Sequence, residues 1–138
     1  MLENSLRDGI LFRFQKSPDK VVALLNNYWK AVQERYPEAW DLPPRKSRLT
    51  HGVGIVSMGY LMDTIAYKLV RKGNVPSCEY FVQELKRLGR NLSWTEGSWN
   101  FSEQLILPWN EVQNTSRHID LMANHLIRLY RNQVPRAN

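Results

Sequence analysis

The sequence contains little cysteine, few acidic residues and no long apolar run. Its one cysteine, Cys78, excludes an internal disulfide, which favours a reducing cytoplasm. No uninterrupted apolar run approaches the roughly 20 residues that cross a bilayer. The first residues lack the basic flank and apolar core of a signal peptide. We therefore expect a cytoplasmic protein that does not insert into a membrane.

The length and composition are those of one globular domain. The chain has 138 residues, of which 43% are hydrophobic and 23% are charged. A chain of this size buries roughly two-thirds of its unfolded surface and needs no metal or disulfide to fold. No repeat or low-complexity tract divides it. The sequence predicts a single domain over residues 1–138, with an N-terminal extension or short strand in 1–16 and a frayed tail over 133–138.

The positive charge is concentrated in one segment. Residues 45–90 hold nine basic and three acidic residues, which accounts for the whole net charge of +6. Such a concentration attracts polyanions, of which nucleic acid is the commonest. The alternatives are cations that only solvate helix ends, or an acidic protein partner. The candidate phosphate-binding residues are Arg45, Lys46, Arg48, Arg71, Lys72, Lys86, Arg87 and Arg90.

Hydrophobic periodicity predicts two long helices in the first half of the chain. Ser17 and Pro18 are a typical helix start, apolar residues then follow at helical spacing, and Pro37 ends that helix near residue 36. A second helix over about 49–70 is apolar on more than one side, so we expect it at the centre of the fold. Its early glycines indicate either close approach of another backbone or a later start near Ser57. Gly73 is the expected glycine at its end.

The second half predicts two further helices and an aromatic loop. A helix over about 77–88 lies between Pro76 and Gly89, and a last helix begins between residues 110 and 115 and reaches about Asn132. Residues 91–108 are rich in aromatic side chains and are expected to form an ordered loop packed on the helices. The predicted fold class is therefore all-α, a bundle of four main helices.

The candidate catalytic groups are few. His118 and His125 are seven residues apart, so helix rise alone separates them by about 10 Å, too far for the usual i, i+4 metal pair. Cys78 lies at a helix start, where a lowered pKa is possible, but no base or oxyanion site accompanies it. Dinucleotide, phosphate-loop and nucleophile-elbow motifs are all absent from the sequence. We expect no enzyme activity, no cofactor and no bound metal.

Five tryptophans are many for 138 residues. Trp29 and Trp40 have the positions of core residues. Trp94 and Trp99 follow the basic segment, where aromatic rings stack nucleobases or contact a partner protein. The alternative is that both rings simply fill the core, which is the commoner arrangement for aromatic side chains.

Three stretches carry a resemblance to a known family. They are residues 24–40 with LLNNYWKAV and RYPEAW, residues 49–65 with LTHGVGI and MDTI, and residues 107–115 with LPWNEVQNT. In this order they resemble the C-terminal helical part of the DGQHR-domain family, which includes the B protein of DNA sulfur-modification (Dnd) systems. The pentapeptide that names the family is absent here, and Asp8-Gly9 shares only two of its letters. No family site residue is therefore carried over.

The resemblance implies a truncated relative or one piece of a split gene, in a bacterial DNA-modification or phage-defence locus. It implies DNA association or regulation rather than chemistry, in agreement with the basic segment. We therefore predict a non-catalytic DNA-associated module. The alternative is a protein-interaction or dimerisation domain, as a homodimer or with another protein, that uses exposed aromatics around Trp94 and Trp99.

Overall fold

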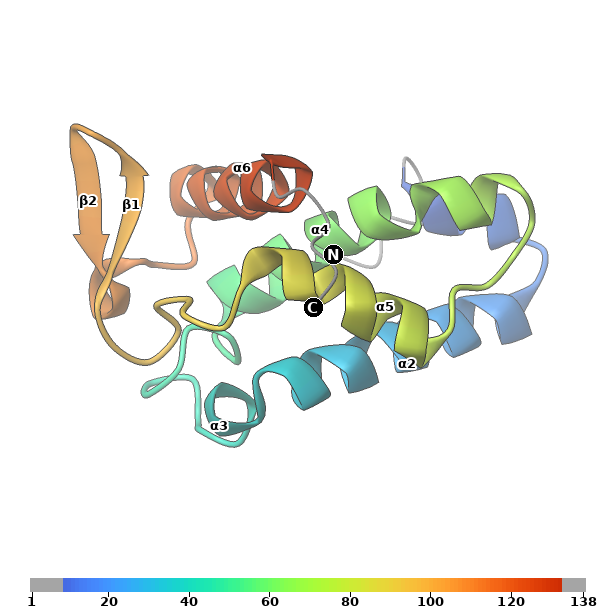
Figure 1. The fold of residues 1–138 in the computed structure, drawn as a ribbon, viewed down its shortest axis with the longest axis horizontal. Helices are drawn as coiled ribbons and strands as arrows, with labels where there is room; N and C mark the ends of the chain where they lie inside the picture. The colour runs from blue at the N-terminus through green and yellow to red at the C-terminus, as the bar shows by residue number, and fades with distance from the viewer. Residues whose placement is uncertain (1–8, 133–138) are drawn as a thin grey trace.

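The computed structural model describes residues 9–132, so the predicted tail over 133–138 and the first eight residues lie outside the described residues. Helices dominate, and a small hairpin stands at one end (Figure 1). The elements in chain order are η1 (Ile10–Phe14), α2 (Pro18–Arg35), α3 (Pro37–Trp40), α4 (Gly52–Arg71), α5 (Cys78–Leu85), η2 (Lys86–Leu88), β1 (Ser98–Ser102), β2 (Leu105–Pro108), η3 (Trp109–Glu111) and α6 (Ser116–Asn132).

The first long helix has the predicted limits. Pro18 is its first residue, and Tyr36 follows its last residue because Pro37 disfavours a helical residue before it. Its buried face consists of Leu24, Tyr28, Ala31 and Val32, the i, i+4, i+7, i+8 spacing of one helix face. The segment before it was predicted to be an N-terminal extension or a short strand within residues 1–16. In the structure, Ile10–Phe14 form the 3₁₀ helix η1, so that stretch is not a strand.

Helix α4 is the central element, as predicted. It packs along α6 and also contacts η1 and α5, while α2 packs along α5. It begins at Gly52, so the alternative start near Ser57 is wrong. At Gly54, an added Cβ would lie 1.8 Å from the carbonyl oxygen of Arg48, which confirms the expected close approach of another backbone. The helix ends at Arg71, and Gly73 follows it with a φ of +83°. The N–H of Gly73 donates to the carbonyl oxygen of Val70, as is typical of a glycine after a helix.

The predicted third and fourth helices are both present, with shifted boundaries. The third is α5 followed by the 3₁₀ turn η2, and the positive φ of Gly89 (+78°) ends it. The fourth, α6, begins at Ser116, after the expected interval. The side chain of Thr115 accepts a hydrogen bond from the N–H of His118 at 3.2 Å, which satisfies one free donor of the first turn.

The all-α fold class is wrong, because residues 91–108 are not only loop. Strands β1 and β2 form a two-stranded antiparallel sheet in which Trp99 faces Leu107 and Asn100 faces Ile106. Along β1 the residues alternate exposed and buried, so Trp99 and Phe101 point inward. This is the period of a half-buried strand. The fold is therefore mostly helical with a small hairpin packed on α6.

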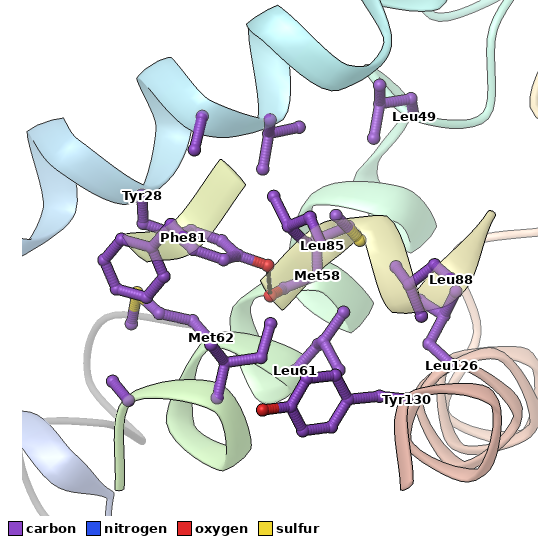
Figure 2. Packing of buried hydrophobic residues seen from close by; sticks show 14 of the residues in the cluster. Tyr28, Leu49, Met58, Leu61, Met62, Phe81, Leu85, Leu88, Leu126 and Tyr130 are labelled. Carbon is purple, nitrogen blue, oxygen red and sulfur yellow. Dashed lines mark hydrogen bonds between the residues drawn. The ribbon is translucent and has the colours of Figure 1, made fainter. Parts of the chain in front are cut away.

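One continuous core connects all the layers. Figure 2 shows Tyr28 of α2, Phe81 and Leu85 of α5, Met58 and Leu61 of α4, and Leu126 of α6 meeting between the helices. The hydroxyl of Tyr28 donates to the carbonyl oxygen of Met58 at 2.5 Å, so this buried polar group is satisfied inside the core (Figure 2). Burial raises the pKa of that phenol. Among the described residues, Arg48 is the only charged residue that is buried.

By length and composition alone, helix α4 could cross a membrane. The sequence was searched only for an uninterrupted apolar run, and polar residues interrupt this helix, so it was not recognised there. It spans 20 residues, and its most apolar window has a mean hydropathy of 1.2. More than half of that window is buried inside the protein, and α2, α5 and α6 surround the helix (Figure 1). This is the pattern of the core helix of a soluble protein.

Candidate nucleic-acid interface

Cations from three separate segments meet at one end of the molecule. In Figure 1 this is the right-hand end, where η1, the start of α2 and the end of α4 lie together. The Nζ of Lys20 donates to the carbonyl oxygen of Gly73 at 3.4 Å and lies 5.3 Å from the centre of the Phe14 ring. These contacts join the first turn of α2 to the turn after α4. We call this region the basic end, and it consists of Arg13, Lys16, Lys20, Lys68, Arg71 and Lys72.

All six cations of the basic end are exposed. Two carboxylates accompany them, Asp19 in the first turn of α2 and Asp63, which lies in the second half of α4 and lines the cleft described below. The positive charges at the end of α4 also stabilise that helix, since its last carbonyls carry partial negative charge. Six exposed cations with two carboxylates make this end a region of positive potential among the described residues.

A cleft of about 740 Å³ opens beside the basic end, between η1, α4, α5 with η2, and α6. Five cations and two carboxylates line it, giving the lining a net charge of +3. Its charged lining residues are Arg13, Lys68, Arg71, Arg87, Arg131, Asp63 and Glu84. The cleft therefore combines the volume of a small-molecule site with a cationic wall.

The inner wall of the cleft is a cluster of tyrosines around an ion pair. Arg87 lies 4.0 Å from the carboxylate of Glu84, and its guanidinium stacks on Tyr130 with 4.6 Å to the ring centre. Tyr80 donates to the carbonyl oxygen of Ile65 at 3.3 Å. Burial, with the charge of Glu84, raises the pKa of Tyr80 to about 12. These phenols therefore stay neutral and serve as hydrogen-bonding groups, not as bases.

The eight cations predicted to bind phosphates do not form one surface. Arg71 and Arg87 line the cleft, and Lys72 follows Arg71 at the end of α4. Lys86 is exposed on η2. The other three exposed cations lie in loops, Arg45 and Lys46 in the turn between α3 and α4, and Arg90 after η2.

Arg90 lies in a second hollow of mixed charge. That hollow is also lined by Arg35 and by the three carboxylates Glu34, Glu38 and Glu96. The carboxylates outnumber the cations, so the hollow does not attract an anion as the first cleft does. The structure thus separates Arg90 from Arg71 and Arg87, although all three belong to the same basic stretch of sequence.

Arg48, the eighth predicted cation, is a structural residue. Its side chain is only 6% exposed. Its guanidinium donates to the carbonyl oxygens of Pro44, Asn110 and Val112 at 3.1, 2.7 and 2.8 Å. The charge is desolvated, which lowers the pKa of Arg48 from its ordinary value. With its donors directed at backbone carbonyls, this side chain is not free to contact a phosphate.

Trp94 and Trp99 also lie inside the protein, each 2% exposed. Their rings contact each other at 5.1 Å between centres, and Trp99 stacks on Phe101 at 6.2 Å. His125 of α6 meets Trp99 edge-on at 5.7 Å. Neither indole ring presents a free face, so base stacking or a partner contact through these two residues has no support in the structure. They pack the hairpin on α6, which is the alternative that the sequence left open.

The histidines and Cys78 have separate structural partners. The Nδ1 of His118 accepts from the N–H of Gln113 at 2.8 Å, and burial lowers the pKa of His125. At Cys78, burial and the carboxylate of Glu34, 3.9 Å from the sulfur, raise the thiol pKa, opposite to the helix-start effect considered above. Within residues 9–132, no three histidine, cysteine or acidic side chains come together as a metal site.

Four cations of this region were not predicted from the sequence: Arg13, Lys16, Lys20 and Arg131. Lys68 lies in the predicted basic segment but was not among the eight candidate residues. Lys68, Arg71 and Lys72 have the i, i+3, i+4 spacing of one helix face, which is a signal in the sequence. Arg13 carries no such signal. Only the packing of η1 on α4 brings it to the cleft.

No protein-family model, curated protein or solved structure matches the chain. The resemblance to the DGQHR-domain family therefore stays a prediction from the residues that carry it.

Proposed function

We propose that this chain is a non-catalytic DNA-associated module of the cytoplasm that binds phosphates through the basic end and the cleft beside it. The observation that carries the proposal is that Arg13 of η1 lines one cleft with Lys68 and Arg71 of α4, although more than 50 residues separate the two segments. Following the resemblance to the DGQHR-domain family, its setting is a bacterial DNA-modification or phage-defence system.

The physical basis is the release of counterions from DNA. Each phosphate that a lysine or arginine neutralises adds about 0.9 to the slope of log affinity against log salt concentration on duplex DNA. Arg13, Lys68 and Arg71 are exposed, whereas the guanidinium of Arg48 is engaged by three backbone carbonyl oxygens. They are therefore suited to phosphate contacts, whereas Arg48 is not.

The test is a fluorescence-anisotropy titration with a labelled duplex at about 50 and 200 mM salt, a range over which phosphate-driven binding falls steeply. The test variant replaces Arg13, Lys68 and Arg71 with alanine. We expect it to lose about tenfold or more in affinity at the lower salt and to reduce the salt slope by up to about three.

The matched control replaces Arg45, Lys46 and Arg90 with alanine, which removes the same charge from exposed residues elsewhere on the surface. We expect this control to lose much less affinity. An equal loss in both variants would mean that net charge alone governs binding, without a defined interface. No binding by the unmodified chain at the lower salt would overturn the proposal.

A further inference from the structure

Two exposed aromatic rings lie in the cationic cleft. Phe12 of η1 is 48% exposed and Tyr67 of α4 is 52% exposed, and both line the same cleft as the five cations. A single exposed ring is ordinary on a protein surface, but two exposed rings that line one cleft form a shared apolar surface that a ligand can cover. A cationic groove with accessible aromatic rings is the arrangement with which proteins hold unpaired nucleotides, because cations follow the backbone and rings stack on bases.

The lining also contains acceptors that a simple phosphate site would not have. Asp63 and Glu84 both line the cleft, and carboxylates repel a phosphate but accept hydrogen bonds from the amino and imino groups of bases. Glu84 belongs to the ion pair with Arg87 on the inner wall. A carboxylate accepts several hydrogen bonds at once, so these groups can accept from a base beside the partners they already have. A nucleotide carries both a phosphate for the cations and N–H groups for the carboxylates, so it matches this lining better than an isolated phosphate does.

The size of the cleft agrees with such an occupant. Sites for small organic ligands have volumes of roughly 300 to 1,000 Å³, and the cleft has about 740 Å³. An intact base pair does not offer its ring faces at the side of a duplex, since they are stacked on the neighbouring pairs. Away from the ends of a duplex, only an unpaired nucleotide presents a ring face to Phe12 or Tyr67.

We infer that the cleft receives an unpaired nucleotide, with its base stacked on Phe12 or Tyr67 and its phosphates on Arg13, Lys68 and Arg71. The inference rests on the proposed function and makes it more specific. The module prefers single-stranded extensions over fully paired duplex, while cations of the basic end such as Lys20 and Lys72 contact the flanking backbone.

The test compares three labelled DNAs, a blunt duplex, the same duplex with a short unpaired extension, and the same duplex with an extension of equal length built from abasic nucleotides. The last two carry the same phosphates and differ only in the bases. We expect the base-bearing extension to bind about fivefold or more tightly than the abasic one, since stacking on an aromatic side chain contributes measurably for each base. A fluorescent 2-aminopurine in the extension is expected to be quenched on binding.

The variant Phe12→Ala with Tyr67→Ala should remove this preference and the quenching, so that the base-bearing and abasic extensions bind equally. The variant Phe12→Tyr with Tyr67→Phe keeps both rings and should keep the preference. The control Val22→Ala with Ile106→Ala removes exposed apolar side chains that do not line the cleft, each 55% exposed, and should behave as the unmodified chain.

The possible failures are distinguishable. Salt-dependent binding with equal affinity for the base-bearing and abasic extensions would overturn this inference and leave the proposed function standing. A preference that survives Phe12→Ala with Tyr67→Ala in a folded protein, checked by circular dichroism, would also overturn it. Failure of all three DNAs to bind at low salt would overturn both.

Discussion

The guanidinium Nε of Arg48 donates a hydrogen bond of 2.8 Å to the carbonyl oxygen of Val112, across 64 residues of sequence. The same side chain bonds to Asn110 and lies 5.4 Å from the centre of the Trp109 ring. The N–H of Arg48 also donates to the carbonyl oxygen of Trp94 at 2.8 Å. Arg48 therefore fixes the connection between α3 and α4 against the segments on both sides of the hairpin.

Replacing Arg48 with lysine is expected to lower the free energy of unfolding by about 2 to 3 kcal/mol, because the ammonium cannot reach the three carbonyl oxygens that the planar guanidinium satisfies. Urea unfolding measures this loss. Arg45→Lys, at an exposed residue nearby, is the control and should change stability by less than about 0.5 kcal/mol. Unchanged stability of Arg48→Lys combined with weaker DNA binding would instead give Arg48 a role in phosphate contact.

Gly54→Ala and Gly52→Ala are expected to differ strongly, although the two glycines are only two residues apart in α4. At Gly54 the added methyl meets the backbone of Arg48 and Leu49 and has no room, so we expect a loss of at least about 3 kcal/mol. At Gly52 it meets only the side chain of Asn114, which can move. The gain in helix propensity should then keep the change within about 1 kcal/mol. Equal thermal stability of the two variants would contradict the close approach at Gly54.

Stability is expected to fall as the pH is lowered below the ordinary histidine pKa of 6.5. Burial lowers the pKa of both His51 and His125 in the folded chain. Between the folded and unfolded pKa values the unfolded chain binds more protons, so the free energy of unfolding decreases toward acid and is retained at neutral pH. His51 adds a second reason, because its Nδ1 accepts the N–H of Val53 at the start of α4 and a protonated ring cannot accept it.

Denaturant midpoints measured between about pH 7.5 and 5.5 check this expectation. The loss of stability should begin near the unperturbed histidine pKa of about 6.5, which lies inside this range. The double variant His51→Asn with His125→Gln keeps polar side chains and removes both titrating rings, so its midpoint should depend less on pH. A midpoint of the unmodified chain that rises toward pH 5.5 would contradict the assignment.

The thiol of Cys78 is expected to react slowly at neutral pH. Burial and the Glu34 carboxylate raise its pKa above the ordinary value of 9.0, which reduces the thiolate that alkylating reagents attack. The rate of reaction with iodoacetamide against pH gives the apparent pKa directly. Glu34→Gln removes the negative charge beside the thiol, so the rise in reaction rate with pH should shift to lower pH. An apparent pKa below 9.0 in the unmodified chain would contradict the contact between Cys78 and Glu34.

The helices could be predicted from the sequence because their signals are local. Ser17, Pro18 and Pro37 limit α2, and Gly73 ends α4, each through the conformations that these residues allow. The hairpin also had a local signal, the alternation of Trp99 and Phe101 with polar residues. That signal spans only five residues, and the density of aromatic side chains around it is equally typical of a packed loop.

The site was less predictable because it depends on packing between distant segments. The cations of residues 45–90 lie in different environments: some line the cleft, Arg90 lines the mixed-charge hollow, and Arg48 is buried. Position along the chain does not distinguish these three environments. The exposure of Phe12 and Tyr67 and the burial of Trp94 and Trp99 likewise follow from which face of each element meets the core.

The bonds that join Arg48 to Trp94 and Val112 have a consequence for the order of folding. Contacts between residues so far apart close long loops, which slows folding relative to a bundle held by neighbouring helices alone. During synthesis, α2, α4 and α5 can emerge and pair while residue 112 and all of α6 are still missing. Until they arrive, the side of α4 that α6 covers stays in water, and that nascent intermediate is the form most exposed to aggregation and to capture by chaperones.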